Sequence, residues 1–165
     1  MFWYVLFVKT GYEDKVVNEI NKTWKGKVGE LRPFVPKRDS KFRKADKVIL
    51  EKCRLFLGYI FIETEIAEAK FAASTYSLIT HSEHALKLLR YGQSNTRFTF
   101  EMKEEEWQAF LRLYNDHDCV DMSQGFIVGG RITITNGPML GFESHIKENK
   151  QAQDGGDNRD GNYGR

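Results

Sequence analysis

The sequence is poor in cysteine and has no long apolar run near its start. Its two cysteines, Cys53 and Cys119, belong to no CxxC pair, so a zinc site or a disulfide scaffold has no support. The opening "MFWYVLFVKT" is apolar for only seven residues after Met1, lacks a basic start and turns polar at Lys9. We therefore expect neither a signal peptide nor a membrane span, and we expect a cytoplasmic protein with reduced thiols.

Catalytic motifs are also absent from the sequence. It contains no phosphate-cradling glycine loop, no GxSxG elbow and no HExxH. His81 and His84 could share a helix face, but no nearby Cys or His completes a set of metal ligands. In "NDHDC" (115–119), His117 and Cys119 are near neighbours in sequence, which rarely point at one another, so a solvated loop is the better interpretation. We predict no enzyme activity, no cofactor and no metal.

The composition is that of a globular protein with one unusual charged stretch. At 165 residues, 41% of them hydrophobic, the chain has room for one domain and a small appendage. Its formal net charge is only +2, yet Arg32 to Arg54 holds nine basic residues against three acidic ones. Such a local excess suits a phosphate backbone or an acidic protein surface, and it also suits a solvated loop.

The hydrophobic pattern predicts alternating strands and helices over the first two thirds of the chain. In order these are a central strand (3–9), a helix (11–24) opened by a Thr10–Glu13 capping box, an edge piece (31–39), a strand (55–63), a helix (66–78), a short strand (85–92) and a helix around 104–114. This order is typical of an α+β, ferredoxin-like split βαβ sandwich. The helices should cover one face of the sheet and leave the other available.

The strand predicted over 55–63 is rich in aromatic residues. Strand alternation places Tyr59 and Phe61 on one face, with Phe56, Ile60 and Ile62 on the other. Gly58 interrupts the run, as a bulge or a close backbone approach would require.

The chain changes character after residue 120. A glycine-rich link (121–130) precedes an alternating strand (131–135), a turn at 136–138, and a strand that resumes over 141–146. Two short strands cannot form a stable unit alone. Residues 149–165 are polar and glycine-rich, and we predict that they are disordered.

Four segments resemble, in order, the NusG family of transcription elongation factors. They are "FWYVLFVKTGYEDKVVNEI", "FVPKR", "RLFLGYIFIE" and "GGRITITNGPMLGFESHIKE". The first three resemble the family's N-terminal (NGN) domain, and the last resembles the opening of its KOW domain, a small β-barrel that would be truncated here. The resemblance implies an NGN-like domain over 1–116, a linker over 117–130, a partial KOW motif over 131–148 and a tail over 149–165. The lysine-rich segment before the aromatic strand suggests a specialised, LoaP-like antiterminator.

The resemblance also implies a partner and a site. In this family an apolar depression on the sheet binds the clamp helices of the largest catalytic subunit of RNA polymerase. By position this implicates Trp3, Phe56 and Tyr59, although ordinary core packing is the alternative for each of them. The basic residues that could contact upstream or non-template DNA, or nascent RNA, are Lys37, Arg38, Lys41, Arg43 and Lys44.

Two other functions compete with this one. An RRM-type RNA-binding module would stack bases on sheet aromatics, but "RLFLGYIF" lacks the spacing of its RNP motifs. A small-molecule-binding ferredoxin-like domain would need convergent polar groups that the sequence does not reveal. The favoured interpretation is a monomeric transcription elongation or antitermination factor.

Overall fold

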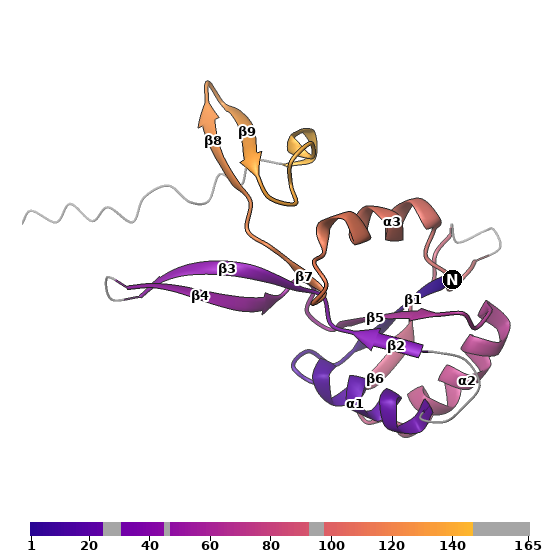
Figure 1. Cartoon of the computed structure of the whole chain (residues 1–165). Helices are drawn as coiled ribbons and strands as arrows, with labels where there is room; N and C mark the ends of the chain where they lie inside the picture. The colour runs from indigo at the N-terminus through magenta and orange to yellow at the C-terminus, as the bar shows by residue number, and fades with distance from the viewer. Residues whose placement is uncertain (25–30, 45–46, 93–97, 147–165) are drawn as a thin grey trace, which may run out of the picture.

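The computed structural model describes residues 1–24, 31–44, 47–92 and 98–146. Its main sheet is antiparallel in the order β2-β5-β1-β6 (Figure 1). The strands are β1 (Phe2–Val8), β2 (Leu31–Phe34), β5 (Tyr59–Thr64) and β6 (Ala85–Leu88). With α1 (Glu13–Trp24) and α2 (Glu68–His81) they complete a βαββαβ unit, so the α+β, ferredoxin-like prediction is confirmed.

One face of the sheet carries the larger core. Tyr4, Leu6 and Val8 alternate along β1 and pack with residues of α1 and α2, among them Val16 and Phe71. The rings of Tyr4 and Phe71 stack with their centroids 4.0 Å apart. The predicted central position of β1 is confirmed, because side chains on both of its faces are buried.

The second face of the sheet is not left free, which corrects the expectation of a bare surface. Helix α3 (Glu104–Leu113) packs across it, and Trp107 and Phe110 contact a second buried cluster that contains Trp3, Val5 and Phe61. The apolar stripe of α3 must be buried somewhere, and both α1 and α2 already occupy the opposite face.

The predicted strand over 55–63 is half wrong. Residues 55–58 form a turn, and β5 begins only at Tyr59. Gly58 adopts a φ of +80°, and a Cβ built on it would lie 3.0 Å from the backbone oxygen of Val8. The turn brings Phe56 to the Phe61 side of the sheet, whereas unbroken alternation had placed it on the other side.

Glu13 has a different role from the predicted capping box. Its side chain is fully buried, and its Oε1 accepts a hydrogen bond from the Gly58 amide at 2.8 Å. The carboxylate therefore joins the start of α1 to the turn before β5.

The basic stretch forms a hairpin that the sequence did not predict. β3 (Lys37–Lys44) and β4 (Lys47–Arg54) pair along their full length and project from the domain in Figure 1. Their many charged residues hide the strand alternation, because neither face of the outer half is buried. Short β7 (Cys119–Val120) pairs with β3 in parallel.

The C-terminal part differs from expectation in its strands. β8 (Gln124–Val128) pairs with β9 (Arg131–Asn136), so the predicted linker (117–130) contains both β7 and β8. A 3-10 helix, η1 (Glu143–His145), lies where a strand was predicted. The predicted disordered tail lies outside the described residues, and the domain limits stay predictions. No helix in the described ranges is long and apolar enough to cross a membrane.

Substituting Gly58 tests the turn. Gly58→Ala should lower the free energy of unfolding by about 1–2 kcal/mol for the left-handed φ, plus the cost of the Val8 contact. Gly11→Ala is the matched control, because Gly11 has a φ of +90° but no atom within 4 Å of the added Cβ. Urea unfolding measures both variants, and equal losses would contradict the close-approach argument.

Candidate functional site

The open part of the second sheet face carries an aromatic patch, made of Phe7, Phe56 and Tyr59. Phe7 pairs with Tyr59 in the β1–β5 register, and their ring centroids lie 5.2 Å apart. All three side chains are partly exposed. Lys87, on β6, places its ammonium 5.7 Å from the centroid of the Phe7 ring. The patch is therefore an apolar surface with a basic rim.

Helix α3 sets the limit of the aromatic patch. Along β1 the residues of this face are Phe7, Val5 and Trp3, and only Phe7 keeps exposed surface. Trp3 is fully buried, and its ring is parallel to that of Trp107 at a centroid distance of 5.9 Å. Of the three predicted residues, Phe56 and Tyr59 thus lie at the surface and Trp3 lies in the core beneath α3.

Sequence reasoning missed Phe7. The signal was present, because Phe7 follows Trp3 and Val5 at the two-residue period of one strand face. It was lost because residues 3–9 are nearly all apolar, so the pattern does not tell which end of the strand a helix covers.

The aromatic patch is joined to the basic hairpin through a short charged link. Arg54 ends β4, and its guanidinium contacts the carboxylates of Asp14 at 2.5 Å and Glu13 at 3.4 Å. A groove of about 690 Å³ lies beside this link, with Leu57 and Arg38 among its lining residues. The aromatic patch and the basic hairpin are therefore neighbours, because the turn at 55–58 connects the end of β4 to the start of β5.

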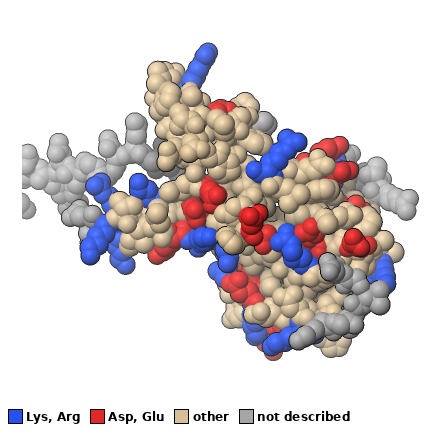
Figure 2. Space-filling view, viewed as in Figure 1, with Lys and Arg blue, Asp and Glu red and all other residues tan. Residues whose placement is uncertain are grey.

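The basic hairpin presents its charges on two faces. Figure 2 shows Lys and Arg gathered on the projecting hairpin. Strand alternation puts Lys37, Lys41 and Arg43 on one face, and Arg38 and Lys44 on the other. The five predicted nucleic-acid residues are brought into one element but not onto one surface. Opposite Lys37, Asp39 and Lys44 lie three further basic residues that the predicted set omitted: Arg54, Lys52 and Lys47.

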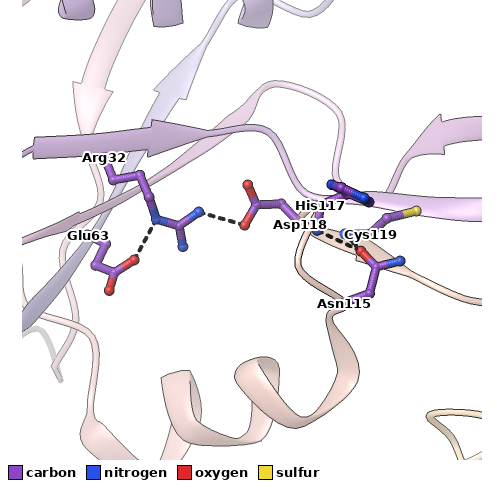
Figure 3. Close-up of polar contacts among 6 residues, drawn as sticks. All are labelled: Arg32, Glu63, Asn115, His117, Asp118 and Cys119. Atoms are coloured by element: carbon purple, nitrogen blue, oxygen red, sulfur yellow. Dashed lines mark hydrogen bonds and ion pairs between the residues drawn. The ribbon is translucent and has the colours of Figure 1, made fainter.

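A polar loop fixes the segment after α3 to the sheet (Figure 3). Arg32 donates to Glu63 and to Asp118, at 2.7 Å in each case. Asn115 Oδ1 accepts the backbone amides of His117 and Cys119 at 2.9 and 3.2 Å. His117 is exposed while Cys119 is fully buried, so these neighbours form no base–thiol pair within this described loop.

Asp39, Cys119 and Asp121 form a trio whose ligand atoms lie within 4.8 Å of one another. Burial, followed by the charge of Asp39, raises the pKa of the Cys119 thiol. The thiol donates to Asp39 Oδ1 at 3.6 Å, an arrangement that suits a neutral thiol rather than a thiolate ligand.

The two histidines that the sequence offered as metal ligands have other partners. His81 Nδ1 donates to the Ser77 carbonyl, and His84 Nε2 accepts from Lys15.

The βαββαβ sheet, the helix across its second face and the inserted hairpin together define an NGN-type domain. A family model described as "Transcription termination factor nusG" matches residues 1–111. The chain belongs to the NusG family, which is a family of transcription factors. No curated protein matches the chain.

The two cysteines should differ sharply in alkylation by iodoacetamide at pH 8. Cys53, which is partly exposed, should react in the native protein, whereas Cys119 should react only after unfolding, because it is buried and its raised pKa keeps the thiol protonated. Peptide mass spectrometry before and after urea measures this. Equal native labelling would contradict the pairing of β7 with β3.

Proposed function

We propose that the chain is a non-enzymatic, cytoplasmic transcription elongation or antitermination factor that binds the clamp helices of bacterial RNA polymerase. The observation that supports the proposal is the aromatic patch, which contains Phe56 and Tyr59, two of the three residues that the family resemblance implicates. A few partly buried aromatic anchors typically supply most of the affinity when a helix binds in a groove. Phe56 and Tyr59 would contact the clamp helices directly. Trp3 would support them from the buried cluster beneath α3.

The covered sheet argues against the RRM alternative. An RRM stacks bases on aromatic residues in the middle of an open sheet. Here the central residues Val5 and Phe61 are buried, and Trp107 and Phe110 pack against the same cluster. Only the margin of the face is exposed, which suits a protein helix better than several stacked bases.

The basic hairpin is the proposed nucleic-acid contact. Lys37, Arg38, Lys41, Arg43 and Lys44 would hold the phosphates of upstream or non-template DNA, or of nascent RNA, without reading sequence. The outer part of the hairpin is exposed on both faces, whereas the base of the hairpin lines a groove together with Leu57, which follows the patch residue Phe56 in sequence. A monomer bound at the patch would therefore hold cations close to the nucleic acid of the polymerase. As a LoaP-like antiterminator, the chain would suppress pausing or termination.

Tyr59→Ala should weaken binding of the full chain to bacterial core RNA polymerase by at least about tenfold, or about 1.4 kcal/mol. Tyr76→Ala on α2 is the matched control, because Tyr76 is 69% exposed and lies away from the patch. Biolayer interferometry with immobilised polymerase measures both. Saturable binding that neither substitution weakens would overturn the aromatic patch as the binding site, and no binding by the wild-type chain would overturn the polymerase proposal.

Removing hairpin charge should lower the salt dependence of nucleic-acid binding. The double variant Lys41→Gln/Arg43→Gln should reduce the slope of log K against log[salt] by about 1 for each phosphate that the hairpin no longer neutralises. The double variant Lys22→Gln/Lys70→Gln removes the same charge from α1 and α2 and should leave the slope nearly unchanged. Fluorescence anisotropy with a labelled 20-mer measures the slopes, and equal slopes for the two double variants would count against the hairpin.

A further inference from the structure

The basic hairpin carries an aromatic side chain that the core does not use. Phe42, near the end of β3, is 46% exposed. Neither of the core clusters formed by the described residues includes it, and its cross-strand neighbour is Ile49. A single exposed apolar residue is common on a protein surface, so the charge around Phe42, rather than its exposure alone, points to a contact.

The surroundings of Phe42 are basic. Its face of the hairpin also carries Arg38, Lys44 and Lys47, with Glu51 as the acidic residue among those described there. Lys41 and Arg43 flank it in sequence and project from the opposite face. The sequence of the turn adds Asp46, so residues 41–50 hold four basic residues and one acidic residue. This excess of positive charge favours an extended polyanion as the partner over a small ligand or a neutral apolar surface.

We propose that Phe42 stacks on an unpaired base of a single-stranded nucleic acid whose phosphates are held by the basic residues of the outer hairpin. The inference rests on the nucleic-acid role proposed for the basic hairpin and names the form of nucleic acid that it takes. An aromatic ring among cations is the usual platform for a single strand, since every base has a π-face and stacking tolerates any sequence. A duplex keeps its base faces stacked inside, so Phe42 would add nothing there.

The opposite face of the hairpin offers a contrast. Leu50 is 64% exposed and Val48 is 55% exposed, and both lie on the face of Lys41 and Arg43. These aliphatic side chains cannot stack on a base. They provide an apolar site for comparison within the same element that is at least as exposed as Phe42.

The test uses the full chain, a labelled 15-nucleotide single strand of mixed sequence, and its duplex. DNA and RNA versions of the strand distinguish the two sources. Phe42→Leu should weaken single-strand binding about tenfold and leave duplex binding unchanged, while Phe42→Tyr should restore single-strand binding. Leu50→Ala should change neither. Anisotropy titrations measure affinity, and urea unfolding verifies that the variants fold.

Each outcome separates this inference from the proposal on which it rests. If wild type binds no oligonucleotide, both the nucleic-acid role and the stacking fail. If wild type binds but Phe42→Leu matches it, or if Phe42→Leu weakens single strand and duplex equally, stacking alone is overturned. Weaker polymerase binding by Phe42→Leu with unchanged oligonucleotide binding would also overturn it, and would assign Phe42 to a protein contact.

Discussion

The buried carboxylate of Glu13 is the interaction on which both candidate surfaces depend. It accepts the Gly58 amide and faces the Arg54 guanidinium, so it holds together the start of α1, the end of the basic hairpin and the turn before β5. A buried carboxylate is costly unless donors surround it, and the loss of one donor would leave an uncompensated charge. The position of Phe56 is therefore fixed by a charge in the core rather than by strand alternation.

Helix α3 then decides how much of the sheet a partner can reach. It buries Trp3 and Phe61 and leaves Phe7 and Tyr59 at the margin. A fully exposed aromatic face would be a large apolar patch, which soluble proteins rarely keep. By covering the centre, α3 leaves a small aromatic patch at the margin, and Phe56 and Tyr59 of this patch pack against the covered cluster.

The segment after α3 is tied to the same framework. Arg32 joins β2 to Asp118, and β7 pairs with the first residues of β3. Burial lowers the pKa of Arg32, but its bonds to Asp118 and Glu63 outweigh this and raise it, so the bridge stays charged. The chain therefore enters β8 from a fixed point beside the base of the basic hairpin. The first residues of the predicted linker (117–130) therefore belong to the fold of the domain, because Asp118 and β7 contact β2 and β3.

The sequence by itself determined the α+β order of elements, the central place of β1 and the concentration of basic charge before β5, because these follow from local periodicity and composition. Through a resemblance of ordered motifs it also singled out Phe56 and Tyr59, which the structure shows to be partly exposed. Only the tertiary structure decided that Trp3 is core, that Phe7 is surface and that the basic run is a two-faced hairpin. Those outcomes depend on which element packs on which face, and such long-range packing leaves no periodic signal in a strand that is apolar throughout.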